Sequence, residues 1–223
     1  MTDNLRKKYV FVTGATGYLG RPLVDRLLER GHSVRALVRA ASASRLRAGV
    51  EAVVGDALDP ASYATRIRQG DVVVHLVGVA HPSPAKAAEF KSIDLASVAA
   101  VAEAAGRAGA SRFVYVSVAQ PAPVMKDYLA ARAAGEAKVR ETGLAASLLR
   151  PWYVLGPGHR WPCLLLPFYA AAWLFPGTRA VARRLGLLRL PTMVRALTRA
   201  VESERPGVEV LDVPALRAAG RTE

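Results

Sequence analysis

Three glycines near the amino terminus, Gly14, Gly17 and Gly20, are spaced three residues apart. They follow a short apolar stretch and precede a stretch of helical periodicity, the context in which a glycine-rich turn binds a dinucleotide. The first glycine permits a tight turn, the second lets the main chain approach a pyrophosphate, and the third lets helix and strand pack closely. Free N–H groups and the helix dipole favour negative charge there. We therefore predict a pyrophosphate-binding turn; the alternative is a purely structural one. The predicted contacts are Gly14, Thr16, Gly17, Tyr18, Leu19 and Gly20.

Arg39 stands at the expected end of the second strand, where one residue distinguishes NAD from NADP. No acidic residue occurs between Glu29 and Glu51, and Arg35 lies four residues before Arg39. A carboxylate there would bind the ribose 2′-hydroxyl of NAD, whereas a guanidinium suits the 2′-phosphate of NADP. The sequence therefore favours NADP(H) over NAD(H). The alternative is that both arginines are ordinary surface charges.

Gly55 and Asp56 follow the third expected strand. The Asp56 carboxylate can accept a hydrogen bond from the adenine amino group, or it can stabilise a turn. Both interpretations remain open. Asp56 and its neighbour Ala57 are included among the predicted cofactor contacts.

These residues need a scaffold that brings several strand ends to one edge. Strand-like and helix-like segments alternate through the first two-thirds of the chain. The expected strands are 9–13, 33–38, 51–54, 71–77, 112–117, 145–149 and 208–213. The expected helices are 21–30, 43–48, 60–68, 89–108, 128–141 and 191–201. Such alternation predicts an α/β Rossmann fold with a doubly wound parallel sheet.

The alternation stops after Arg150, where a stretch rich in Pro, Trp and Leu begins. We expect residues 1–150 to form an NAD(P)-binding Rossmann core. Residues 151–223 are expected to form a small substrate-side lobe packed on the same domain, since 223 residues are too few for two ordinary domains.

Four segments resemble a known superfamily, the extended and atypical short-chain dehydrogenase/reductases. They are VTGATGYLG (12–20), VVGDALD (53–59), RFVYVSV (112–118) and LLRPWYVLGPG (148–158). That superfamily includes sugar-nucleotide epimerases, NmrA-like redox sensors and the Rossmann subunit of respiratory complex I. The resemblance covers nearly the whole chain and implies further cofactor contacts. These are Leu76, Val77, Gly78, Pro151, Tyr153 and Val154.

The same resemblance implies a catalytic site. In active members a Tyr is the general acid/base, a Lys four residues later lowers its pKa, and a Ser or Thr after the fifth strand holds the substrate oxygen. The corresponding residues here are Tyr128, Arg132 and Ser117, with Val118 where related epimerases have a second Ser. A free Tyr has a pKa of about 10, so a nearby cation is needed to make its phenolate accessible. Arg supplies that charge but cannot exchange a proton near neutral pH.

Two hypotheses for function follow. One is an NADPH-dependent oxidoreductase with a modified Ser117–Tyr128–Arg132 site, acting on a small or lipophilic carbonyl or quinone substrate. The other is a non-catalytic dinucleotide-binding protein that senses redox state or assists the assembly of a partner.

Charge and composition limit the other possibilities. The net charge is +13, and residues 142–201 contain eight arginines and no acidic residue. This basic stretch can attract anions or simply be a solvated face. No zinc, helix-turn-helix or RNA-binding pattern accompanies it, so we expect no nucleic-acid partner. The four histidines are isolated, so we also expect no metal site; His75, in an apolar strand, is interpreted as a core residue.

The segment 161–176 is very apolar and is followed by arginines. It is interrupted by prolines and shorter than the roughly 20 residues of a spanning helix. It can line a pocket for a lipophilic substrate, lie in a membrane interface together with the rest of 161–199, or be buried in the fold or a homodimer interface. A monomer and a homodimer both remain open. The single cysteine, Cys163, and the absence of a signal-peptide pattern favour a cytoplasmic, possibly membrane-peripheral protein.

Overall fold

The computed structural model describes residues 6–79, 83–122, 124–159, 163, 164, 167, 172 and 176–221. Its centre is a seven-stranded parallel sheet with the order β3-β2-β1-β4-β5-β6-β9. The strands are β1 (Tyr9–Thr13), β2 (Ser33–Val38), β3 (Glu51–Val54), β4 (Val72–His75), β5 (Arg112–Val116), β6 (Ala146–Leu149) and β9 (Val208–Leu211). The strand order reverses between β1 and β4, which opens a crevice at the carboxyl edge of the sheet. The predicted doubly wound Rossmann fold is confirmed.

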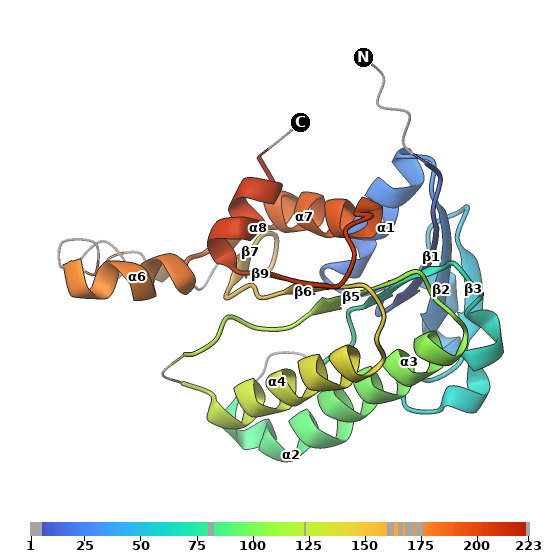
Figure 1. Ribbon diagram of the computed structural model, residues 1–223, viewed down its shortest axis with the longest axis horizontal. Helices are drawn as coiled ribbons and strands as arrows, with labels where there is room; N and C mark the ends of the chain where they lie inside the picture. Colours follow the sequence, from blue (N-terminus) through green and yellow to red (C-terminus); the bar gives the residue numbers. More distant parts are fainter. Residues whose placement is uncertain are drawn as a thin grey trace.

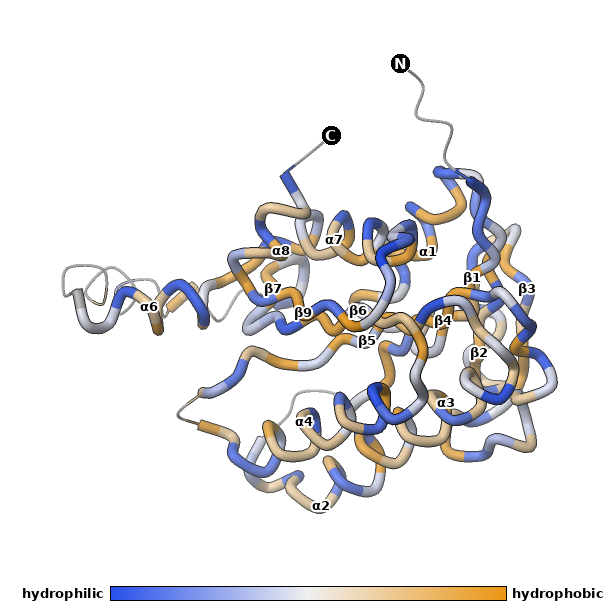
Figure 2. Tube along the Cα trace, viewed as in Figure 1, coloured by the Kyte–Doolittle hydropathy of each residue, from blue (hydrophilic) through white to orange (hydrophobic). Residues whose placement is uncertain are grey.

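Helices cover both faces of the sheet (Figure 1). On one face lie α1 (Gly20–Glu29), α7 (Leu190–Glu202) and α8 (Val213–Ala219), and on the other α3 (Ala96–Arg107) and α4 (Lys126–Glu141). Successive strand side chains point to opposite faces, so a strand covered on both sides is apolar throughout. In β1, Val10 and Val12 join the core under α1, whereas Phe11 joins the core under α3. Hydrophobic residues accordingly concentrate in the central strands (Figure 2).

The first helix shows how local sequence ends an element. α1 buries Leu23 and Leu27, which are four residues apart on one face. It ends at Glu29, and Gly31 follows the C-cap residue Arg30 with a φ of +80°, which glycine adopts at little cost. The amide of His32 then donates to the carbonyl of Leu27 at 3.0 Å, closing the helix end.

Two expected helices are instead 3-10 turns. Residues 43–48 lie partly in a 3-10 helix at Ala40–Arg45, and residues 60–68 contain the short turns Pro60–Ser62 and Ala64–Arg66. The Asp59 side chain accepts from the amide of Ala61 at 3.2 Å. Side-chain caps of this kind stabilise turns in competition with longer helices.

The expected helix 89–108 is divided into three parts. It begins as α2 (Ala87–Glu89), continues as a π-helix at Phe90–Leu95 and becomes α3 at Ala96. The wider π-helical turn changes which side chains face inward, and it buries Phe90 and Asp94. Hydrophobic periodicity alone does not reveal this change.

The carboxyl-terminal third contains elements that the sequence did not predict: β7 (Val154–Leu155), β8 (Leu188–Arg189), α6 (Pro176–Arg184) and α8. Among the described residues, β7 and β8 pair only with each other, and both are too short for periodicity to reveal. Asp212 caps the start of α8, and its side chain accepts from the amide of Ala215 at 3.0 Å. The predicted strand 208–213 is two residues longer than β9, which ends at Leu211, and it overlaps the start of α8.

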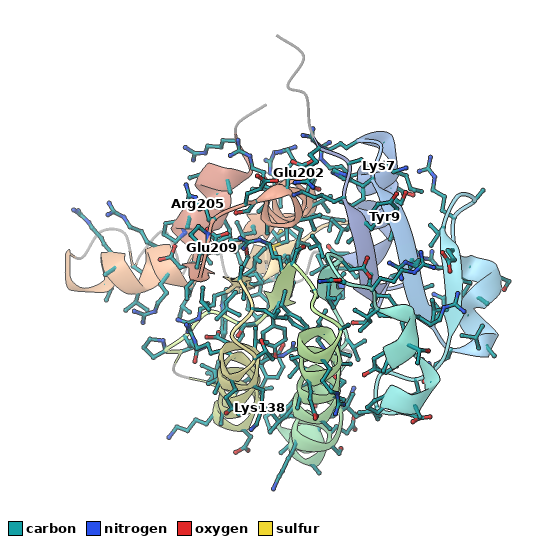
Figure 3. The ribbon with its side chains drawn as sticks, turned by 45° about the vertical axis from the view of Figure 1, so that its right-hand side comes forward. Lys7, Tyr9, Lys138, Glu202, Arg205 and Glu209 are labelled. Carbon is teal, nitrogen blue, oxygen red and sulfur yellow. The ribbon has the colours of Figure 1, made fainter. Side chains whose placement is uncertain are left out.

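Ion pairs lie at the amino edge of the sheet. Arg35 donates to both carboxylate oxygens of Asp71 at 2.6 Å, and both side chains are buried. The interpretation of Arg35 as a surface charge is therefore wrong. At the far end of the same edge, Arg205 and Glu209 form an ion pair whose closest nitrogen and oxygen are 3.6 Å apart (Figure 3).

Within the part of the chain that the structure describes, no helix has the length and hydropathy to cross a membrane. Most of the apolar segment 161–176 lies outside the described residues, so its predicted roles concern residues that are not described.

Candidate functional site

The predicted glycine turn connects β1 to α1. Gly14 has a φ of +77°, and its carbonyl accepts from the amide of Gly17 at 3.0 Å. A Cβ on Gly20 would overlap the Gly14 carbonyl oxygen and lie 2.7 Å from the main chain of Ala15. A Cβ on Gly17 would meet only that carbonyl oxygen, at 3.1 Å, and would otherwise point into open space. The turn therefore leaves bare main chain at the start of α1, as a diphosphate requires.

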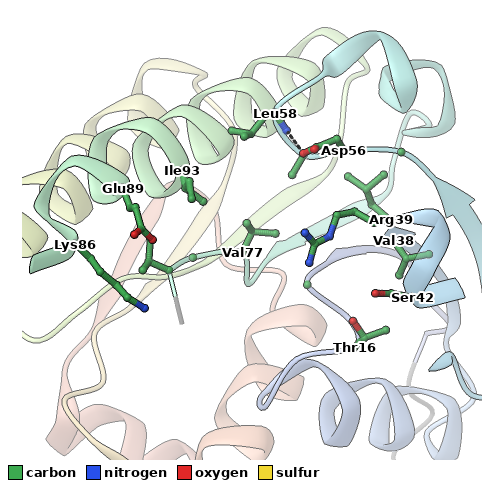
Figure 4. A pocket seen from close by; sticks show the side chains of 16 residues that line it. Thr16, Val38, Arg39, Ser42, Asp56, Leu58, Val77, Lys86, Glu89 and Ile93 are labelled. Carbon is green, nitrogen blue, oxygen red and sulfur yellow. Dashed lines mark hydrogen bonds between the residues drawn. The ribbon is translucent and has the colours of Figure 1, made fainter. Parts of the chain in front are cut away.

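A crevice of about 460 Å³ opens above this turn (Figure 4). Its walls come from the segments that follow β1, β2, β3 and β4. The structure brings seven predicted contacts together in it: Gly14, Thr16, Arg39, Asp56, Ala57, Val77 and Gly78. These positions are adjacent only in the fold, because four separate strands supply them.

Arg39 points into the crevice, near Thr16 and Ser42 (Figure 4). Its guanidinium is exposed, and no acidic side chain within the described residues pairs with it. An unpaired cation beside two hydroxyl side chains suits a phosphate ester. Asp56 lines the crevice as well, while one of its oxygens accepts from the amide of Leu58 at 2.9 Å. The turn role of Asp56 is thus observed, and a contact with adenine remains a prediction.

Sequence reasoning missed part of the lining. Ser42 comes from the 3-10 turn after β2, and Lys86, Glu89 and Ile93 come from the irregular stretch after β4. Lys86 and Glu89 lie at the end of the crevice away from Asp56 (Figure 4). No periodic pattern marks these residues, because they belong to turns and to the π-helix.

The other predicted contacts lie outside the crevice lining: Gly17, Tyr18, Leu19, Gly20, Leu76, Pro151, Tyr153 and Val154. Several of them connect the glycine turn to its surroundings. The Tyr18 hydroxyl donates to the Val154 carbonyl at 3.3 Å, and its ring stacks on His159 at 4.8 Å. Burial raises the pKa of Tyr18, so its hydroxyl remains a donor.

Gly14 and Leu76 approach closely, since a Cβ on Gly14 would lie 3.0 Å from the Leu76 main chain. The Pro151 carbonyl accepts from the amide of Ala119 at 2.8 Å. The ring of Tyr153 packs on the ring of Trp152, with ring centres 5.1 Å apart. The loops after β5 and β6 are therefore joined at the carboxyl edge of the sheet.

Tyr128 and Arg132 lie on one face of α4, as their spacing predicts. The guanidinium of Arg132 sits 5.2 Å from the centre of the Tyr128 ring and 2.6 Å from a carboxylate oxygen of Asp94. Burial opposes the charge on Arg132, but Tyr128, Tyr115 and Asp94 outweigh it, so the pKa of Arg132 is raised. Arg132 therefore remains a cation, and Asp94 forms an ion pair with it.

For Asp94, burial outweighs the neighbouring groups that favour its charged form. Burial raises the pKa of Asp94, and the charge of Arg132 and the amide of Val79 oppose that shift. Sequence spacing does not reveal Asp94, because its partner Arg132 lies on a different helix.

Ser117 follows β5 at the same edge of the sheet. It is only 4% exposed, and its hydroxyl has no hydrogen-bond partner in the described structure. A buried hydroxyl without a partner is costly and calls for an explanation. A substrate oxygen could accept a hydrogen bond from the Ser117 hydroxyl.

Tyr128 packs edge-on against Phe90, with ring centres 5.1 Å apart.

His75 is a core residue, as predicted. One ring nitrogen lies 2.9 Å from the Thr13 hydroxyl and the other 3.3 Å from the Ser97 hydroxyl. Burial, helped by the charge of Arg132, lowers the pKa of His75 to about 3, so the ring is neutral. Among the described residues, no group of three His, Cys, Asp or Glu side chains is arranged to hold a metal ion.

A glycine turn between the first strand and helix of a doubly wound sheet, opening into a crevice with an unpaired arginine, defines a protein of the nicotinamide-dinucleotide-binding Rossmann class. Residues 14–158 match the family described as NAD(P)H-binding. The chain therefore belongs to that NAD(P)H-binding family, which is consistent with its resemblance to the extended and atypical short-chain dehydrogenase/reductases.

The chain is similar to two curated reductases. It is 34% identical over 151 residues to a ceramide reductase of Caulobacter vibrioides, a match that covers 67% of this chain and 47% of that protein. It is 35% identical over 175 residues to a 3-diazoavenalumate denitrifying reductase of a Streptomyces species, covering 67% and 57%. The chain thus spans about half the length of these relatives.

Among solved structures, the fold is similar to that of the enzyme WbmH of Bordetella bronchiseptica in complex with NAD+. The TM-score is 0.68 at 22% identity, and the match covers 93% of this chain and 75% of that one. This similarity shows the shared fold.

Proposed function

We propose that the protein is an NADPH-dependent oxidoreductase that acts on a small or lipophilic carbonyl or quinone. The observation that carries this proposal is the buried, unpartnered hydroxyl of Ser117, at the same sheet edge as the glycine turn. The unpaired Arg39 in the crevice supports NADPH over NADH, and the reductase names of two relatives support the class of reaction.

Each residue has a defined part in this proposal. The main chain at Gly14 and Gly17, with the start of α1, holds the diphosphate, and Arg39 holds the 2′-phosphate. Bound NADPH supplies a hydride to the substrate carbon or quinone. The Ser117 hydroxyl donates a hydrogen bond to the substrate oxygen, and Tyr128 transfers its proton to that oxygen. Solvent returns a proton to Tyr128, since Arg132 cannot supply one near neutral pH.

The test is Tyr128→Phe assayed with NADPH and a panel of carbonyls and quinones. We expect kcat/KM to fall by at least about 100-fold, because general acid catalysis contributes that much, while the Kd for NADPH stays unchanged. Tyr9→Phe is the matched control, because Tyr9 is exposed at the amino end of β1. Equal NADPH oxidation by both variants would show that Tyr128 is not the acid.

A second candidate is a non-catalytic dinucleotide-binding protein that senses redox state or assists assembly. The ion pair of Arg132 with Asp94 favours it, since Asp94 offsets part of the positive charge that would stabilise a phenolate on Tyr128. Saturable NADPH binding by the wild type without turnover of any acceptor would select this candidate.

We also propose peripheral contact with an anionic membrane through α6 and its flanks. α6 projects from the body of the molecule (Figure 1). Arg179 and Arg183 are exposed on it, within the stretch 142–201 that has no acidic residue. Basic helices of this kind are attracted to acidic headgroups.

A further inference from the structure

The ion pair of Asp94 and Arg132 lies beneath the crevice, between two helical segments. Asp94 comes from the π-helix and is fully buried, and Arg132 comes from α4 and is 7% exposed. Their closest nitrogen and oxygen are 2.6 Å apart. Desolvation of two charges offsets much of their attraction, so a buried pair adds little stability compared with apolar residues of the same size. Its presence here therefore calls for another reason.

Each partner also holds the main chain of a loop at the carboxyl edge. The second carboxylate oxygen of Asp94 accepts from the amide of Val79 at 3.0 Å, and Val79 lines the crevice. Arg132 donates to the carbonyl of Val116 at 2.9 Å, directly before Ser117. The pair thus connects the loop after β4 to the end of β5.

Gly78 shows how closely the crevice wall lies on this pair. A Cβ at Gly78 would overlap the guanidinium of Arg132 and lie 3.0 Å from a carboxylate oxygen of Asp94. Gly78 itself lines the crevice. The position of the wall therefore depends on the position of the pair beneath it.

We propose that Asp94 and Arg132 are positioning residues. They hold the loop at 77–79 and the main chain at Ser117 so that the bound dinucleotide and the substrate are correctly placed relative to each other. This inference rests on the proposed function and assigns Arg132 a role other than the predicted catalytic one. It acts through hydrogen bonds to the main chain and needs no proton exchange by Arg132.

The chain contains a matched control at the opposite edge of the sheet. Arg35 and Asp71 form a buried pair at the same distance of 2.6 Å. Asp71 also accepts from the amide of Arg68 at 2.7 Å, and Arg35 also donates to the carbonyl of Arg66. The two pairs share their chemistry and their main-chain contacts, but only the Asp94 pair lies under the crevice.

The experiment compares the double variants Asp94→Leu/Arg132→Met and Asp71→Leu/Arg35→Met with the wild type. Apolar side chains of similar volume keep buried sites packed without leaving one charge unpaired. Urea unfolding measures stability, calorimetry measures the Kd for NADPH, and steady-state kinetics measures kcat/KM. Hydrogen exchange of the Val79 amide in the free protein reports the loop directly.

We expect both double variants to fold with comparable losses of stability. Only Asp94→Leu/Arg132→Met should weaken NADPH binding, lower kcat/KM by about 100-fold through misplacement and accelerate exchange at Val79. Arg132→Lys should give a smaller loss, because one ammonium replaces a guanidinium that contacts both Asp94 and the Val116 carbonyl.

Equal effects of the two double variants on NADPH affinity would overturn the proposal, since they would indicate general destabilisation. A wild-type Kd together with unchanged exchange at Val79 would also overturn it. Wild-type protein that binds NADPH without turnover contradicts the oxidoreductase function alone, and the Kd still tests positioning. Wild-type protein that does not bind NADPH contradicts the proposed function, and exchange at Val79 then decides the inference.

Discussion

Arg39 illustrates how far a single residue can be interpreted from sequence. Its place after the second strand predicted a contact with the adenine ribose, and the structure places it in the crevice with Thr16 and Ser42. Arg35 has the same side chain, yet it forms a buried pair with Asp71. The spacing between the two arginines did not reveal this difference, because Asp71 is distant in sequence.

We expect Arg39→Ala to raise the Kd for NADPH by about 10- to 100-fold and to leave the Kd for NADH unchanged. The physical reason is that a charge-assisted hydrogen bond to the 2′-phosphate contributes about 1.5–3 kcal/mol. Calorimetry with both cofactors measures the two constants.

Arg45→Ala is the matched control for Arg39, because Arg45 ends the same 3-10 turn and lines a neighbouring hollow instead. Its removal should leave both constants close to wild type. Parallel losses of NADPH and NADH affinity in Arg39→Ala would contradict the 2′-phosphate role.

Asp94 shows what sequence reasoning on single residues misses. The spacing of Tyr128 and Arg132 suggested a tyrosine activated by a cation. The structure shows that the cation is paired with a carboxylate from a segment more than thirty residues earlier in the chain. A buried ion pair requires two residues that the fold brings together, so neither residue alone predicts the pair.

At the scale of elements, the strands were predicted well and the irregular segments were not. A strand buried on both faces is a short apolar run, which is visible in β1 and β4. The π-helix at Phe90–Leu95 has the composition of an ordinary helix, and its wider turn follows from tertiary packing. That segment supplies Asp94 and Ile93, so the site was least predictable where the helix geometry departs from the usual period.

α6 carries the element-scale prediction. We expect Arg179→Gln/Arg183→Gln to weaken binding to anionic vesicles by about 30-fold, because each arginine near an acidic surface contributes about 1 kcal/mol. Flotation with phosphatidylserine vesicles at low salt measures the bound fraction.

The control variant Lys91→Gln/Lys126→Gln removes the same charge from exposed positions on the π-helix before α3 and at the start of α4. It should float like the wild type. Absence of wild-type flotation at low salt would contradict the membrane proposal. Equal losses of vesicle binding in both variants would indicate that net charge alone is responsible.

At the scale of the whole molecule, His75 connects pH to stability. Its pKa is about 3 in the fold, against about 6.5 in an unfolded chain. Below pH 6.5 the unfolded chain takes up a proton that the folded protein does not, so this contribution to stability is complete above pH 6.5 and is lost as the pH falls towards 3. At pH 5 the loss amounts to about 2 kcal/mol.

Urea unfolding of the wild type and His75→Gln at pH 7.5 and pH 5 tests this prediction. The variant should be less stable at pH 7.5, because the Thr13 and Ser97 contacts of the ring are altered. It should nevertheless lose about 2 kcal/mol less than the wild type between the two pH values. Identical pH dependence of both proteins would show that His75 is accessible to protons in the fold.

The way β9 and α7 join the rest of the fold has a practical consequence for trimming the chain. The family match ends at residue 158, but β9 hydrogen-bonds along β6, and α7 packs on α1. A fragment that ends at residue 158 would expose β6, whose four residues are all buried, as a bare apolar edge. Such edges recruit other chains, so we expect the shortened product to accumulate as aggregate during expression.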